Sequence, residues 1–222
     1  MEIKLTVRAE VIAMLKLFAP NKDVHHCLTG INLEIGRKET CLVASNGAML
    51  GCYRIESEQP DADAPLTNII IPNDLLKPIK STGLVEITIG ERETKDNGES
   101  EEVPVSNVRP VTITYAGLSI SGKTLDGEYP DFRRVIPAKV SGQPAQFDPR
   151  LIATLAKAWS ILHGSHSPHC VGIGHNGNDG ALISLGDDNF VGVIMPLHPH
   201  AVVTPDTPPS WVHDYSPEGE RP

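Results

Sequence analysis

The chain has 222 residues, of which 40% are hydrophobic and only 5% aromatic, so we expect a core of aliphatic side chains. Its formal net charge of −9 argues against a protein that coats DNA with its whole surface, because phosphate neutralisation requires lysine and arginine. No apolar run reaches the length of a membrane span, and residues 1–10 lack the apolar stretch of a secretory signal, so we expect a cytoplasmic protein. Cys27, Cys41 and Cys52 lie in strand-like runs, and we interpret all four cysteines as small buried hydrophobic residues.

The first quarter of the chain is predicted to contain one helix followed by strands. Apolar residues recur at helical spacing over residues 6–19, and Thr6 is suited to cap the N-terminus of this helix. The buried stripe consists of Val7, Val11, Leu15 and Phe18. Residues 26–35 and 41–55 predict strands, and Ser45-Asn46-Gly47 predicts a turn that divides the second run in two.

The middle of the chain is predicted to be mainly β-structure. Residues 68–72 predict a short strand, after which Asn73 caps a short helix that Pro78 limits. Residues 84–90 and 111–121 alternate between apolar and polar side chains, as half-buried strands do. The charged, turn-rich segment between them predicts an extended hairpin loop.

The last part of the chain is predicted to contain one long helix, three strands and a tail. The helix covers residues 146–162, with Asp148 as its N-cap and Pro149 as its first residue. Its apolar stripe consists of Leu151, Leu155, Trp159 and Leu162. The strands are predicted at residues 170–174, 180–185 and 189–195. Residues 198–222 contain six prolines and are interpreted as a flexible tail.

These elements form a weak internal repeat, in which a helix is followed by several strands. The pattern occurs over residues 1–56, 65–136 and 146–197. Each unit is too small to bury its own apolar face, so we expect the units to join edge to edge, with the helices on one side of continuous sheets. The predicted fold class is therefore α+β, with repeated helix-plus-strands units and antiparallel sheets.

Four segments carry a resemblance to a known family. Residues 127–137 read GEYPDFRRVIP and resemble the motif G-[RE]-[FY]-P-D-[FY]-R-R-V-[LI]-P. Residues 43–50, VASNGAML, resemble V-A-T-D-G-H-R-L; residues 28–30, LTG, resemble L-N-G; and residues 193–197, VIMPL, resemble V-V-M-P-M/L. Over roughly residues 5–197 the chain thus resembles the bacterial DNA sliding clamps, the beta subunit of DNA polymerase III.

The resemblance implies a shortened clamp. Clamps of this family have three similar domains, each built from two helix-and-strands units. Residues 1–137 resemble the middle domain, residues 138–197 resemble the second half of the last domain, and residues 198–222 form the tail. Because the family's ring contains twelve units, three units per chain would close as a tetramer, and we expect a homo-oligomer. A monomer or dimer that does not encircle DNA is the alternative.

The resemblance also implies a hydrophobic pocket that binds short peptides of polymerases, clamp loaders and repair proteins. Such a pocket needs apolar recesses for Leu or Phe anchors and a few polar groups. Carried over residue by residue, it consists of Leu28, Ser45, Gly47, Met49, Leu50, Pro130, Arg134, Val135, Val193, Met195 and Pro196. The family's His-Arg pair is Ala48-Met49 here, which makes the pocket more apolar and should change its peptide preference. Ordinary core at a junction between units would show the same residue types.

In the family the helices line the ring and face double-stranded DNA. The three predicted helices and their capping turns carry seven basic and three acidic side chains, whereas the rest of the chain carries 12 basic and 25 acidic ones. The basic residues are Arg8, Lys16, Lys22, Lys77, Lys80, Arg150 and Lys157. This segregation fits a positive channel that holds DNA nonspecifically, although any amphipathic helix with a basic solvated face gives the same pattern.

Two motifs suggest other chemistry. Residues 117–124 match the phosphate-loop pattern GxxxxGKT of nucleotide hydrolases, but the residues that follow cannot start the regular helix that such a loop requires. His163, His166, His169 and Cys170 are possible zinc ligands, yet the Gly, Ser and Pro among them favour a polar loop.

No nucleophile has a base at interpretable spacing. We therefore predict a protein without catalytic residues, metal or cofactor that tethers replication or repair proteins at DNA. A clamp mimic that binds the same partners as a decoy is the alternative.

Overall fold

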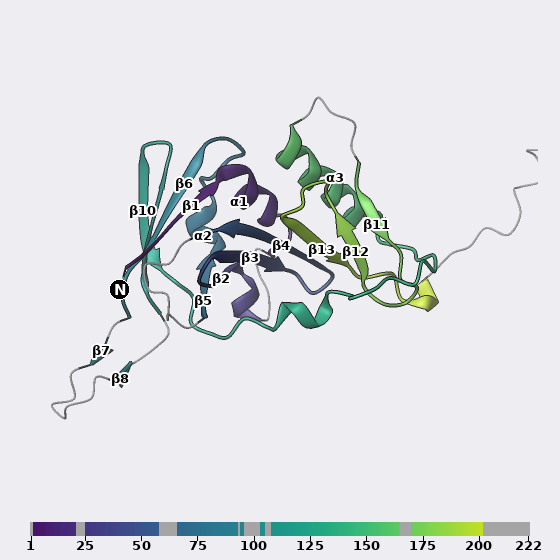
Figure 1. Cartoon of the computed structure of the whole chain (residues 1–222), viewed down its shortest axis with the longest axis horizontal. Coiled ribbons are helices and arrows are strands. Elements are labelled where there is room, and N and C mark those ends of the chain that lie inside the picture. Colours follow the sequence, from purple (N-terminus) through teal and green to yellow (C-terminus); the bar gives the residue numbers. More distant parts are fainter. Residues whose placement is uncertain are drawn as a thin grey trace, which may run out of the picture.

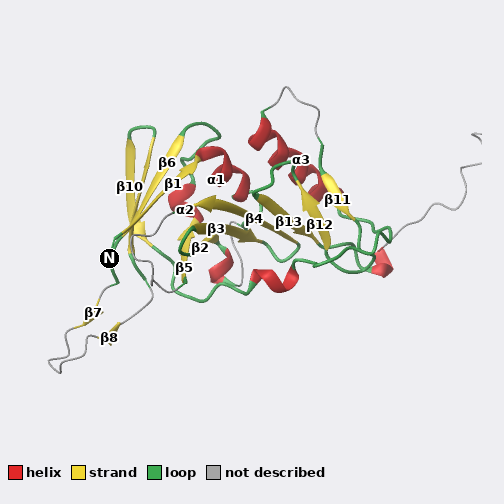
Figure 2. Cartoon of the chain, in the orientation of Figure 1, coloured by secondary structure: helices red, strands yellow, loops and turns green. Residues whose placement is uncertain are grey.

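The structure is a computed structural model that describes residues 2–20, 25–57, 66–92, 94–95, 103–104, 108–164 and 170–201. In these residues a four-stranded antiparallel sheet has the order β1-β6-β9-β10, and a seven-stranded antiparallel sheet has the order β11-β12-β13-β4-β3-β2-β5. The helices α1, α2 and α3 lie on one side of the seven-stranded sheet (Figure 1). Two short strands, β7 (Thr94–Lys95) and β8 (Val103–Pro104), pair with each other apart from both sheets (Figure 2).

The N-terminal segment begins as a strand, which corrects the prediction of a helix from residue 6. Strand β1 (Ile3–Arg8) pairs antiparallel with β6 (Leu84–Ile89), and helix α1 (Ala9–Leu15) starts only after Arg8. Thr6 therefore lies in a strand and is not the N-cap. The predicted stripe is buried, but Val7 reaches the core from β1 because Leu5 and Val7 also satisfy the two-residue period of a strand.

The seven-stranded sheet combines strands from residues 30–72 with strands from residues 172–194. Its central strands are β2 (Gly30–Ile35), β3 (Glu39–Ser45) and β4 (Met49–Glu56). The turn predicted at Ser45-Asn46-Gly47 is confirmed, and residues 46–48 connect β3 and β4. Strand β13 (Phe190–Ile194) pairs with β4, so that Val193 lies opposite Leu50. Strands β12 (Ala181–Ser184) and β11 (Gly172–Gly174) extend the sheet, which confirms the strands predicted at residues 180–185 and 170–174. Residues 26–28, predicted as strand, instead form the 3-10 turn η1 (His26–Leu28).

The two faces of this sheet have different covers. Helices α1 and α3 (Pro149–His163) pack against one face and against each other, around Phe18, Leu155 and Trp159. The opposite face is covered by residues 125–136, which include the 3-10 turn η2 (Phe132–Val135). Tyr129 and Phe132 close a second, smaller core there, together with Val43, Leu50, Cys52, Ile70 and Val193.

The middle elements follow the prediction with two differences. Strand β5 (Thr67–Pro72) leads into α2 (Asn73–Leu76), but the Asn73 side-chain amide donates to the Pro20 carbonyl at 3.0 Å and does not cap the helix. The single predicted run of residues 111–121 is a hairpin of β9 (Pro110–Tyr115) and β10 (Leu118–Lys123). Its turn needs positive φ at Ala116 (51°) and Gly117 (78°), which the alternating pattern did not indicate.

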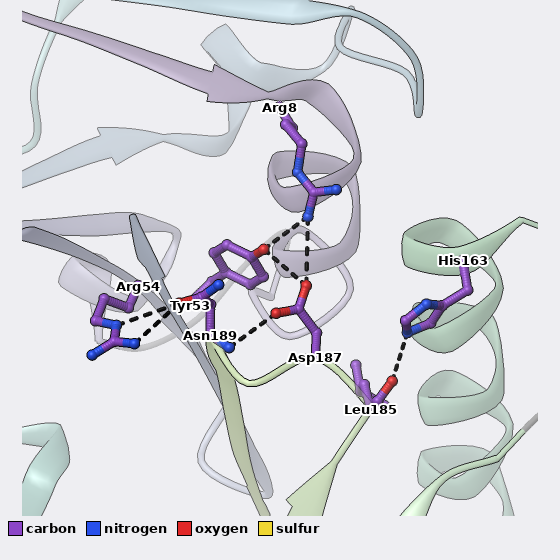
Figure 3. Close-up of polar contacts among 7 residues, drawn as sticks. All are labelled: Arg8, Tyr53, Arg54, His163, Leu185, Asp187 and Asn189. Carbon is purple, nitrogen blue, oxygen red and sulfur yellow. Dashed lines mark hydrogen bonds and ion pairs between the residues drawn. The ribbon is translucent and has the colours of Figure 1, made fainter. Parts of the chain in front are cut away.

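The prediction for α3 is confirmed at its N-terminus. Asp148 accepts a hydrogen bond from the Arg150 backbone N–H at 2.9 Å, and Pro149 is the first helical residue. At the other end His163 contacts the Leu185 carbonyl at 2.6 Å (Figure 3), and η3 (Pro199–Ala201) ends the described chain. Most of the predicted loop at residues 91–110 and tail residues 202–222 lie outside the described residues. Within the described residues no helix is long and apolar enough to cross a membrane.

Candidate functional site

A pocket of about 220 Å³ opens on the face of the seven-stranded sheet that residues 125–136 cover. Four segments that are distant in the sequence form it: η1, the β3–β4 turn, residues 129–135 and the end of β13. Its lining consists of Leu28, Ser45, Gly47, Ala48, Met49, Leu50, Tyr129, Pro130, Asp131, Phe132, Val135, Val193 and Met195.

One wall of the pocket is part of the sheet. The Asn46 side-chain oxygen accepts hydrogen bonds from the N–H groups of Ala48 (3.0 Å) and Met49 (2.8 Å), which shapes the β3–β4 turn. The Met195 N–H donates to the Ala48 carbonyl at 2.8 Å, immediately beyond the pairing of Val193 with Leu50. The turn and the end of β13 are thereby held together as one surface.

Residues 129–135 form the opposite wall of the pocket, and an ion pair holds this wall against the sheet. Arg133 forms two hydrogen bonds with the carboxylate of Glu34 on β2, one of them from Nη1 to Oε2 at 2.7 Å. The same guanidinium lies 4.5 Å from the centroid of the Phe132 ring. Asp131 accepts a hydrogen bond from the Arg133 N–H at 3.2 Å and so caps η2. These contacts fix the position of Tyr129, Pro130 and Phe132 over the sheet.

The chemistry of the pocket is that of apolar recognition. At its mouth Val135 and Met195 are 52% and 42% exposed, which is high for large apolar side chains. The Tyr129 hydroxyl is buried and lies close to the Ser45 backbone, but it makes no hydrogen bond of good geometry among the described residues. Burial raises the pKa of Tyr129 above its usual range. The pocket can therefore accept apolar side chains, and its lining contains no paired nucleophile and base.

Comparison with known proteins identifies the fold. No protein-family model and no curated protein matches the sequence. The structure of the DNA polymerase III subunit beta from Pseudomonas aeruginosa matches with a TM-score of 0.59 and 15% identity, over 88% of this chain and 66% of that one. The DNA polymerase sliding clamp from Bacillus subtilis matches with a TM-score of 0.57 and 15% identity, over 89% and 64%.

A third match is a putative DNA polymerase III beta subunit from Eubacterium rectale, with a TM-score of 0.61 and 12% identity over 89% of this chain and 65% of that one. The chain has the sliding-clamp fold. The predicted α+β clamp fold is thus confirmed, and the chain spans slightly less than two thirds of the length of these clamps.

In this clamp fold, nine of the eleven residues predicted for a pocket line the same cavity. Arg134 and Pro196 do not: Arg134 is exposed on η2, and Pro196 lines a separate hollow with Gln146 and Leu197. Tyr129, Asp131 and Phe132 were missed, although they adjoin Pro130 in the same motif and the continuity of that segment could have indicated them. Ala48, noted in the sequence only as a departure from the family, also lines the cavity.

Two of the predicted DNA-facing residues form hydrogen bonds with other groups of the protein. The Arg8 guanidinium donates to the Tyr53 hydroxyl at 2.7 Å and lies 3.5 Å from Asp187, to which Tyr53 also donates at 2.9 Å (Figure 3). The Lys16 ammonium donates to the carbonyls of Leu76 (2.9 Å), Ile79 (3.0 Å) and, at 3.4 Å, Lys77. Burial lowers the pKa of Lys16, and its charge closes the C-terminal end of α2.

The other predicted basic residues differ in their surroundings. Lys77 pairs with Asp74 at 2.7 Å, and Arg150 pairs with Asp148. Lys80 and Lys157 are exposed and have no ion-pair partner within the described part of the chain. Lys22 lies outside the described residues. The available positive charge on the helical side is therefore smaller than the residue count predicted.

Neither of the two motifs of other chemistry forms a site within the described residues. Residues 118–123 are strand β10, and no helix begins directly after Thr124, whose hydroxyl accepts from the Arg109 N–H at 2.9 Å. The phosphate-loop pattern therefore lacks the helix N-terminus that binds phosphate. Of the four possible zinc ligands, His166 and His169 lie outside the described residues, and the described ones contain no cluster of three or more His, Cys, Asp or Glu suited to a metal.

Proposed function

We propose that this chain is a non-catalytic, clamp-like protein that holds replication or repair proteins at DNA by binding short peptide segments of those proteins. The observation that carries the proposal is the pocket. Residues from four distant segments converge on one apolar recess, with Val135 and Met195 exposed at its mouth. A recess that is rigid on both sides and apolar inside suits the anchor residues of an extended peptide.

The similarity in fold supports the choice of partners that we propose. The similar structures are named as DNA polymerase III beta subunits and sliding clamps, and at 12–15% identity they share the fold with this chain. The partners that we propose are peptides of the DNA polymerase and clamp-loader type, together with double-stranded DNA bound nonspecifically. We propose that the chain acts as a homo-oligomer.

The composition of the pocket defines the class of peptide. Ala48 and Met49 offer neither a charge nor a side-chain hydrogen-bond donor, and Met195 can adapt its thioether to differently shaped anchors. We therefore propose that the pocket selects peptides through Leu or Phe anchors, and that salt affects their binding only weakly.

The pocket is tested by Met195→Asp, measured by fluorescence anisotropy with a labelled synthetic peptide that carries Leu and Phe anchors. A carboxylate at the mouth would have to lose water whenever an apolar anchor enters, so we expect at least a tenfold loss of affinity. Leu118→Asp is the matched control, because Leu118 is also exposed (60%) and apolar but lies on β10. Equal affinity of the Met195→Asp variant and the wild type would contradict the proposal.

A further inference from the structure

The chain leaves the pocket shortly before the described residues end. Met195 lines the pocket, and the described chain ends six residues later at Ala201. Residues 202–222 follow, with the sequence VVTPDTPPSWVHDYSPEGERP. This sequence has a proline-rich first part and then two aromatic residues, Trp211 and Tyr215. None of its residues has a role in the function proposed above.

We propose that residues 210–215 occupy the pocket of their own chain and compete there with partner peptides. The inference rests on the proposed peptide-binding function and names an occupant of the same site. It assigns the C-terminal segment a regulatory role, since only a partner that binds more tightly than the chain's own segment would displace it.

The length of the segment permits this contact. Six residues separate Met195 from Ala201, so Ala201 lies at most about 20 Å from the pocket. Ten residues separate Ala201 from Trp211, and they span up to about 33 Å when extended. Pro205, Pro208 and Pro209 favour the extended polyproline conformation, which keeps such a spacer long at a small entropic cost. The span from Ala201 to Trp211 is longer than the largest distance from Ala201 to the pocket, so Trp211 can reach the pocket.

The chemistry of the segment matches the pocket. A Trp ring carries a large apolar area, and Met195 and Met49 provide sulfur atoms that contact aromatic rings favourably. Residues 202–222 contain four acidic residues and one arginine. Arg134, next to the pocket residue Val135, is exposed and has no ion-pair partner among the described residues, so it offers a complementary charge.

Tethering makes even weak binding effective. A short linker gives a local concentration of about 1 mM, so a segment with an intrinsic dissociation constant of about 0.2 mM would weaken a competing peptide roughly sixfold. A partner with micromolar affinity would still displace the segment.

The full-length chain with Trp211→Ala tests the inference, and Glu218→Ala serves as a control in the same segment. We expect Trp211→Ala to tighten binding of the labelled Leu/Phe peptide about three- to tenfold and Glu218→Ala to change it less than twofold. Unchanged affinity of the Trp211→Ala variant would overturn the inference.

A second readout needs no peptide. The difference between the emission spectra of the wild type and the Trp211→Ala variant isolates Trp211, because Trp159 is the only other tryptophan. We expect blue-shifted emission that becomes water-like in a Met195→Asp background. Water-like emission in the wild type, or a blue shift lost on dilution, would overturn the intramolecular contact. If the peptide bound no variant, the proposed function would fail, and the Trp211 emission would still decide whether the segment occupies the pocket.

Discussion

Tyr129 brings a polar atom into an apolar part of the pocket wall. The residue is 7% exposed, and its hydroxyl lies near the Ser45 backbone without a hydrogen bond of good geometry among the described residues. Tyr53 shows the opposite arrangement, because its hydroxyl accepts from Arg8 and donates to Asp187 (Figure 3). A buried hydroxyl without a partner costs about 1–3 kcal/mol, whereas a hydrogen-bonded one stabilises the fold. The two tyrosines therefore form a natural pair for comparison.

We predict that Tyr129→Phe leaves the free energy of unfolding unchanged or raises it by about 1 kcal/mol, because the substitution removes an unpaired hydroxyl and keeps the ring. Tyr53→Phe should lower it by about 1–2 kcal/mol, because Arg8 and Asp187 lose a shared partner. Urea denaturation at constant m-value measures both changes. A loss for Tyr129→Phe as large as that for Tyr53→Phe would show that the Tyr129 hydroxyl is hydrogen-bonded in solution.

Single residues differ in how far the sequence predicts their place. Met195 and Pro130 could be placed at the pocket because each stands in a short motif whose neighbours have a recognisable order. The position of Lys16 could not be predicted, because its ammonium binds carbonyls 60 and more residues away. A charge count assumes that each basic side chain points to solvent, and at Lys16 this assumption fails.

At the scale of elements, η2 is the part of the pocket that depends most on a single contact. Arg133 reaches back across the sheet to Glu34, whose side chain is only 9% exposed. The neighbouring Arg134 makes no such contact and is exposed. The position of the pocket wall should therefore depend on one of two adjacent arginines.

We predict that Arg133→Met lowers the free energy of unfolding by about 1–3 kcal/mol, because it leaves a nearly buried carboxylate unpaired. Residues 129–135 also lose the ion pair that holds them against the sheet, so the variant should bind the labelled peptide several times more weakly. Arg134→Met is the matched control and should change stability by less than about 0.5 kcal/mol. Thermal unfolding and anisotropy measure the two effects, and equal stability of the two variants would contradict this role of Arg133.

The elements that were predicted correctly carry strong local signals. Asp148 followed by Pro149 identifies the start of α3, and Ser45-Asn46-Gly47 identifies the β3–β4 turn. The first element was assigned wrongly because two periods coincide there: Val7 and Val11 are four residues apart, as in a helix, whereas Leu5 and Val7 are two apart, as in a strand. Pairing with β6 decides between them, and this partner lies about 80 residues away.

At the scale of the whole molecule, the pairing of β13 with β4 brings the C-terminal part of the described chain beside residues 49–53. This pairing sets Val193 and Met195 beside the β3–β4 turn and so completes the pocket. Strand patterns alone could not have selected it, because many apolar strands of similar length were available as partners. The order of the family motifs supplied the missing information, since they named residues on both sides of this pairing.

The DNA binding that we propose requires a basic face on a chain with a net charge of −9, and we assign this face to the helical side of the molecule. All three helices lie on the same side of the seven-stranded sheet (Figure 1). Lys157 on α3 and Lys80, four residues after α2, are exposed without ion-pair partners among the described residues. Arg8 and Lys16 already bind groups of the protein. Contact with phosphates should therefore depend chiefly on the free lysines.

We predict that the double variant Lys80→Glu/Lys157→Glu binds a labelled DNA duplex more weakly than the wild type. The plot of log K against log salt concentration should also become less steep by about 2, because each lost phosphate contact reduces the steepness by about 0.9. Lys16→Met should leave this slope unchanged while it destabilises the fold, because its charge is held by the carbonyls after α2. Anisotropy titrations at several salt concentrations measure the slopes. An unchanged slope in the double variant would show that DNA contacts a different face and that the helical side has only a structural role.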